Sequence, residues 1–60
     1  MPFITVDMLE GRTPAQKKKV VEGITEVLFS IGVPRESTWV LINDHPAGNW
    51  SQGGRLLSEK

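Results

Sequence analysis

The 60-residue chain is long enough for one small domain, residues 1–60, and its seven basic and seven acidic side chains give a formal net charge of zero. That balance argues against a nucleic-acid or anionic-membrane binder, and the absence of cysteine excludes disulfides and thiolate metal sites. No apolar run approaches the roughly 20 residues of a membrane span, and no signal-peptide pattern is present, so we expect a cytoplasmic protein.

The first predicted element is a β-strand from Pro2 to about Met8. Its side chains alternate between an apolar face and a mixed face, with Ile4, Val6 and Met8 on the first and Phe3, Thr5 and Asp7 on the second. Glu10-Gly11 then indicates a turn.

A helix is predicted from Pro14 to Ile31. Thr13 can cap it, Pro14 suits the first helical position, and Gln16 stands where a capping box requires it. Apolar residues recur at helical spacing, namely Val20, Val21, Ile24, Val27, Leu28 and Ile31. Gly32 and Pro34 indicate where the helix ends.

A second strand is predicted from about Ser37 to Asn43, with a continuously apolar centre at residues 39–42. Strand, helix and strand form a βαβ unit, so the strands should be parallel. Residues 44–57 contain turn residues and Trp50, and they predict a short hairpin that packs on a neighbouring copy. A chain this short buries only roughly 60% of its unfolded surface, so we expect other copies to cover the exposed sheet.

Pro2 has chemical potential only if Met1 is removed, because its ring nitrogen then becomes a secondary amine. A neutral amine can act as a general base toward a proton on carbon next to a carbonyl. Taken alone, however, Pro2 is more simply a residue that begins a strand.

The other candidates are also ambiguous when each is taken alone. Arg12, after the first strand, can grip a carboxylate with two hydrogen bonds, but a solvated arginine paired with Glu10 or Asp7 is the simpler interpretation. Trp50 suits either a pocket wall or an interface, and Trp39 a core or an interface. The lysines at 17–19 are interpreted as a solvated face and His45 as a surface loop residue. No phosphate-binding loop, nucleophile elbow or metal-ligand spacing is found.

Together, these residues resemble the 4-oxalocrotonate tautomerase family over nearly the whole chain. The specific part is Leu-Glu-Gly-Arg-Thr at residues 9–13, at a fixed distance from Pro2. Gln16-Lys17 on the first helical turn adds to it, and Asn49-Trp50 followed by Gly53-Gly54 resembles the family's C-terminal segment.

The resemblance implies a βαβ subunit of tautomerase-like α/β fold, assembled as a homohexamer that is a trimer of dimers. It also implies an isomerase without a cofactor, in which an amino-terminal proline shuttles a proton during keto–enol tautomerisation of an unsaturated 2-oxo acid. Pro2 matches the catalytic base, and Arg12 matches the arginine that binds the substrate carboxylate. Trp50 takes the place of an aromatic that lines the pocket, and Leu9 lies at the pocket's edge.

One departure concerns Trp39, which stands where many members carry a second arginine that helps to polarise the 2-oxo group. An indole offers one N–H donor, which puts turnover of a dicarboxylate in question. The alternatives are that Arg35 or Arg55 of a neighbouring subunit substitutes, or that the substrate differs, for example a monocarboxylate or an arylpyruvate-like enol. We include Trp39 among the substrate-binding residues.

Two other functions remain open. Trp39 also motivates a non-catalytic oligomeric binding protein of the same fold, which retention of Met1 would favour because an acylated proline nitrogen is not a base. We expect the native chain to begin at Pro2. A small nucleic-acid-binding module rests only on the three lysines and the exposed aromatics, and the neutral charge disfavours it.

Overall fold

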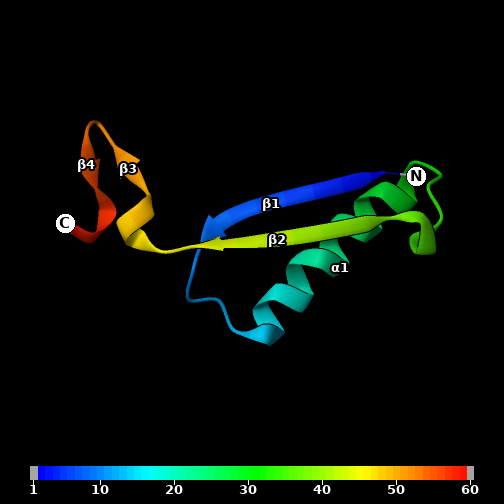
Figure 1. Ribbon diagram of the computed structural model, residues 1–60. Helices are drawn as coiled ribbons and strands as arrows, with labels where there is room; N and C mark the ends of the chain where they lie inside the picture. Colours follow the sequence, from blue (N-terminus) through cyan, green and yellow to red (C-terminus); the bar gives the residue numbers. More distant parts are fainter. Residues whose placement is uncertain (1, 60) are drawn as a thin grey trace.

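A computed structural model describes residues 2–59, and Met1, whose removal decides the chemistry of Pro2, lies outside the described residues. The chain forms the predicted βαβ unit followed by a short C-terminal hairpin (Figure 1). The elements in order are β1 (Phe3–Leu9), α1 (Pro14–Ser30), η1 (Arg35–Ser37), β2 (Trp39–His45), η2 (Ala47–Asn49), β3 (Ser51–Gln52), β4 (Arg55–Leu56) and η3 (Leu57–Glu59).

The second strand differs from its prediction at both ends. Ser37 belongs to η1, where its N–H donates to the carbonyl oxygen of Pro34 at 3.0 Å, so β2 begins at Trp39. The strand then continues past Asn43 to His45. The interpretation of His45 as a loop residue was therefore wrong.

The two strands of the βαβ unit pair in parallel, as predicted. Phe3 lies opposite Trp39 at one end of the pair, and Leu9 lies opposite His45 at the other. The hairpin strands β3 and β4 pair antiparallel through a turn at Gly53 and Gly54, both of which have positive φ. The hairpin projects beyond the end of β2, away from α1 (Figure 1).

The predicted capping box begins α1. The backbone N–H of Gln16 donates to Thr13 Oγ1 at 3.2 Å, and the backbone N–H of Thr13 donates to Gln16 Oε1 at 2.9 Å. At the other end, Ile31 is the cap residue and Gly32, with φ of 100°, turns the chain out of the helix. The helix therefore ends one residue before its predicted end.

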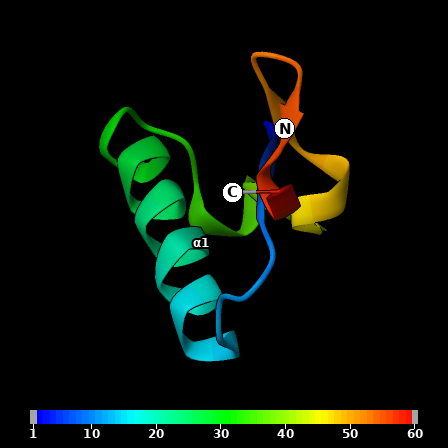
Figure 2. The ribbon, with the colours of Figure 1, turned by 90° about the vertical axis from the view of Figure 1, so that its left-hand side faces the viewer.

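One face of the β1–β2 sheet is covered by α1, and the other is open. Figure 2, which looks at the chain from the hairpin end, shows α1 to one side of the strands. Toward the helix lie the half-buried Ile4 and Val6 of β1. Toward solvent lie Phe3, Trp39 and Leu41, whose exposed fractions are 63%, 54% and 48%.

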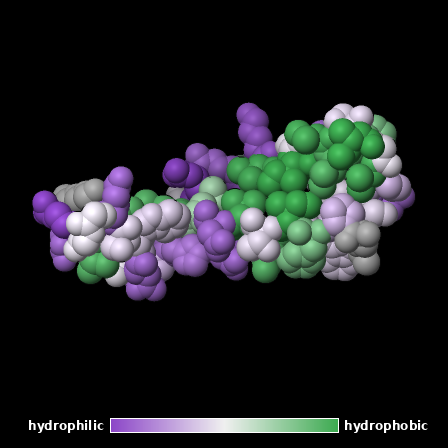
Figure 3. Space-filling model, turned by 90° about the horizontal axis from the view of Figure 1, so that it is seen from above, coloured by the Kyte–Doolittle hydropathy of each residue, from purple (hydrophilic) through white to green (hydrophobic). Residues whose placement is uncertain are grey.

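Residues 2–59 of a single copy form no buried core. Among the residues that the structure describes, none is buried. Large apolar side chains on α1 and at its C-cap are also exposed, with Val27 at 66% and Ile31 at 73%. Hydrophobic side chains gather over the strand–helix part, whereas the hairpin end is mostly hydrophilic (Figure 3). This distribution agrees with the expectation that other copies of the chain cover the apolar surface.

Candidate functional site

The predicted site residues lie at two opposite ends of the β1–β2 pair. Pro2 immediately precedes β1, whereas Leu9 is the last residue of β1 and Arg12 follows it after two residues. At about 3.3 Å per residue, a strand of this length separates its ends by roughly 20 Å. One copy of the chain therefore does not bring Pro2 and Arg12 to the same small molecule.

Aromatic side chains flank Pro2. The backbone N–H of Trp39 donates to the carbonyl oxygen of Pro2 at 3.1 Å, which ties the start of β2 to the start of the chain. Trp39 and Phe3 are register partners on the open face of the sheet, and both are more than half exposed. The Pro2 end therefore presents an apolar, aromatic surface.

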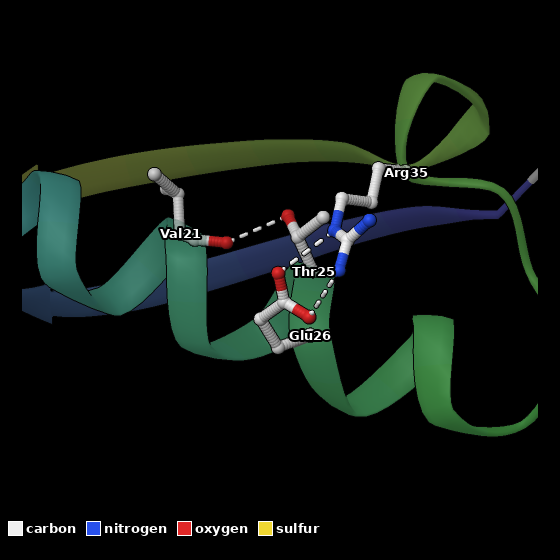
Figure 4. A network of polar contacts seen from close by, with 4 residues as sticks. All are labelled: Val21, Thr25, Glu26 and Arg35. Carbon is white, nitrogen blue, oxygen red and sulfur yellow. Dashed lines mark hydrogen bonds and ion pairs between the residues drawn. The ribbon is translucent and has the colours of Figure 1, made fainter.

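Arg35, which the sequence offered as a substitute for the missing second arginine, is engaged by α1. Its Nε and Nη2 atoms donate to the two carboxylate oxygens of Glu26 at 2.8 and 3.1 Å (Figure 4). Its guanidinium carbon also lies 3.7 Å from the centre of the Phe29 ring. The hydrogen bond from Arg35 lowers the pKa of Glu26, and the bond to Glu26 raises the pKa of Arg35.

A short turn holds Arg12 at the opposite end. The backbone N–H of Glu10 donates to the carbonyl oxygen of His45 at 2.9 Å, and Gly11 adopts a positive φ of 115°. Thr13 follows as the capped start of α1. Both flanks of Arg12 are thus fixed, while its guanidinium makes no ion pair within residues 2–59.

Asp7, proposed from the sequence as a partner of Arg12, binds other residues. Its Oδ1 atom accepts a hydrogen bond from Asn43 Nδ2 at 3.2 Å and lies 2.9 Å from His45 Nε2. The hydrogen bond with His45, and secondarily that with Asn43, lowers the pKa of Asp7. Neither suggested ion pair of Arg12, with Glu10 or with Asp7, forms within residues 2–59, so that interpretation was wrong.

His45 connects this polar cluster to the hairpin. Its imidazole meets the indole of Trp50 edge-on, with ring centres 5.9 Å apart and an interplanar angle of 75°. His45 is also the register partner of Leu9. It therefore links Leu9 and Trp50, the two residues predicted to line the pocket near Arg12. The sequence analysis interpreted His45 only as a loop residue, because its contacts with Asp7 and Trp50 join segments that no local sequence pattern relates.

One apolar hollow contains none of the predicted site residues. It is an apolar groove of about 520 Å³ between β1 and α1, lined by Ile4, Lys19, Val20, Gly23, Ile24, Val27 and Leu28. A Cβ added at Gly23 would meet nothing within 4 Å, so this side of α1 is open in one copy. A smaller hollow of about 260 Å³ is lined in part by Glu26 and Arg35.

Residues 2–59 contain neither a metal-binding cluster nor a membrane-spanning helix. This part of the chain has no group of three or more His, Cys, Asp or Glu side chains placed to hold a metal ion. None of its helices has the length and apolar character needed to cross a membrane.

Comparisons with known proteins give consistent results. A family model described as tautomerase enzyme matches residues 2–60. A probable tautomerase of Bacillus cereus is 41% identical over an alignment of 61 positions, which covers both chains completely. Among solved structures, a 4-oxalocrotonate tautomerase isozyme of Methylibium petroleiphilum has a TM-score of 0.89 and 38% identity, covering 95% of this chain and 94% of that one. A 4-oxalocrotonate tautomerase of Chloroflexus aurantiacus, described as a heterohexamer, has a TM-score of 0.90 and 27% identity, covering 98% and 97%.

Proposed function

Because the chain belongs to the tautomerase enzyme family, as its resemblance predicted, we propose that it is a cofactor-independent isomerase that interconverts the enol and keto forms of an unsaturated 2-oxo acid. Pro2 acts as the general base once Met1 is removed, and Arg12 binds the substrate carboxylate. The observation that carries the proposal is the family match, which includes Pro2 and the whole Leu9–Thr13 block.

We further propose that each site is completed by two copies of the chain. A general base acts within hydrogen-bonding distance of the proton it moves, whereas Pro2 and Arg12 of one copy are separated by the length of β1. The Pro2 end of one copy must therefore meet the Leu9, Arg12 and Trp50 end of another. The exposed apolar surface supports such an assembly, which we propose to be a homo-oligomer, in line with the homohexamer that the resemblance implies.

The chemistry follows from the groups that meet there. Arg12 holds the carboxylate by paired N–H···O bonds, which orients the enol. The neutral amine of Pro2 accepts the proton of the enol hydroxyl, the C–O bond becomes a carbonyl, and the electron pair moves to carbon. The protonated amine then returns the proton to that carbon. Apolar surroundings favour the neutral amine between turnovers, which is the role we assign to Trp50.

The first test compares two forms of the same chain, one processed to begin at Pro2 and one that retains Met1. Both carry identical side chains, but in the second form the proline nitrogen is an amide without basicity. We expect enol ketonisation, followed by ultraviolet absorbance, to fall by about 100-fold or more in the Met1-retaining form, as expected for loss of a general base. Equal rates in two forms of equal size in solution would exclude Pro2 as the base.

A second test addresses the sharing of the site between copies. Pro2→Ala and Arg12→Ala chains should each be nearly inactive. After joint unfolding and refolding, random mixing in a symmetric oligomer should restore about a quarter of the sites, because one copy contributes Pro2 and another Arg12. A mixture that stays inactive although mixed oligomers form would show that both residues must come from one chain.

The alternative is a binding protein of the same fold without catalysis, and the observation that favours it is the exposed indole of Trp39 in place of an arginine. In that case, the processed protein would bind 2-oxo acids saturably but leave the rate of enol ketonisation unchanged.

A further inference from the structure

Of the three arginines of the chain, only Arg35 lies toward the Pro2 end, and it is already engaged. Arg35, which lies just before β2, is held by both carboxylate oxygens of Glu26 and by the face of Phe29. Arg12 and Arg55 make no ion pair within residues 2–59, and both lie away from Pro2, since Arg12 follows the end of β1 and Arg55 begins β4 of the hairpin. The Pro2 end thus has no free arginine of its own.

The exposed side chains at the Pro2 end are aromatic and not cationic. Trp39 is tied to Pro2 through its backbone N–H, and its side chain shares the open face of the sheet with Phe3. Both rings are more than half exposed in one copy, so they are available to a ligand or to another copy. An indole and a phenyl ring favour contact with an aryl or apolar group and provide a single N–H donor between them.

We infer that the substrate of the proposed tautomerase carries one carboxylate and an apolar, preferably aryl, tail, and that Trp39 determines this specificity. The inference rests on the proposed function. Arg12 of one copy binds the carboxylate, Pro2 of another moves the proton, and Trp39 beside Pro2 contacts the tail. A second carboxylate at the tail would lose its hydration against Trp39 and Phe3 without gaining a charged partner, so a dicarboxylate should be the poorer substrate.

The test measures kcat/KM of the processed protein for the enol of phenylpyruvate and for a 2-hydroxydienedioate, which carries two carboxylates. We expect the wild type to favour the aryl enol by at least about tenfold, the scale of discrimination by apolar pockets. Trp39→Arg should reverse the preference. Trp39→Phe should keep it, and Arg35→Ala, which opens the Glu26 ion pair without touching the proposed site, should leave the ratio unchanged.

Each outcome separates the two proposals. No turnover of either enol would overturn the proposed function. Turnover that favours the dicarboxylate, or an unchanged ratio in Trp39→Arg chains of wild-type size, would overturn only the specificity. If Trp39→Arg chains fail to assemble, the Trp39→Leu variant tests the specificity instead, because leucine keeps the open face of the sheet apolar. A Trp39→Leu protein that assembles and retains the full aryl preference would show that Trp39 serves the contact between copies and not the substrate.

Discussion

Leu41→Lys should break the assembly of the chain and its activity together. Leu41 lies in the middle of β2, opposite Thr5, on the face of the sheet that α1 does not cover. Its side chain is 48% exposed in one copy, although it is apolar and central to the sheet. If other copies cover this face, Leu41 is among the side chains that they bury.

The size of the effect follows from that exposure. Complete burial of a leucine is worth about 1.5–3 kcal/mol, and about half of it remains to be gained, so assembly gains roughly 1 kcal/mol per copy from Leu41. Lysine loses this gain and adds the cost of desolvating an ammonium, unless its stem carries the charge to the edge of the contact. The expected loss is therefore about 1–4 kcal/mol per copy, or roughly 5-fold to 1000-fold in association.

The assay is sedimentation velocity over a dilution series, with circular dichroism and enol ketonisation measured on the same samples. Wild-type chains should sediment well above the 6.7 kDa of one copy, and Leu41→Lys should shift toward monomer or unfolded chain and lose activity in proportion. Glu22→Lys, an exposed position on α1, is the control for added positive charge. A Leu41→Lys protein that sediments and catalyses like the control would refute the assignment of the open face to a contact between copies.

Three further changes test local features of the fold. Thr13→Ala removes the hydroxyl that accepts the Gln16 N–H, and it should lower stability by about 1 kcal/mol in chemical unfolding at fixed protein concentration. Glu26→Gln should lower the midpoint of thermal unfolding at neutral pH. Since the pKa of Glu26 is lowered from 4.5, its ion pair stabilises the fold above that value and is lost as pH falls through the lowered pKa, so the two proteins should converge in acid. His45→Ala removes the ring against Trp50, and it should lower the fluorescence anisotropy of Trp50 in a Trp39→Phe background, whereas unchanged anisotropy would mean that other contacts hold the indole.

Local sequence patterns correctly predicted those elements that are determined by residues close together in the sequence. Thr13, Pro14 and Gln16 lie within one helical turn, so the start of α1 could be predicted from their side chains alone. The parallel pairing followed from the order of strand, helix and strand.

The errors occurred where a distant partner decides the structure. The predicted strand ended at Asn43, but β2 continues through Asp44 and His45, which pair with Met8 and Leu9 of β1. The Asp7 carboxylate binds both Asn43 and His45 across the two strands. The same carboxylate was one of two partners suggested for Arg12, because it is close in sequence. Hydrophobic periodicity contains no information on such contacts between polar side chains of neighbouring strands.

The parallel arrangement itself explains why catalysis and assembly should be inseparable in this chain. Parallel strands place both of their starts at one edge of the sheet, here with Pro2 and Trp39, and both of their ends at the other, here with Leu9 and His45. A base before the first strand and a cation after it are therefore always a strand length apart. A twofold axis that sets two such sheets antiparallel would bring each Pro2 to the Arg12 end of the other copy, and it would complete two sites with one contact. A substitution on the open face that never touches substrate should then reduce kcat per chain only as far as it dissociates the copies.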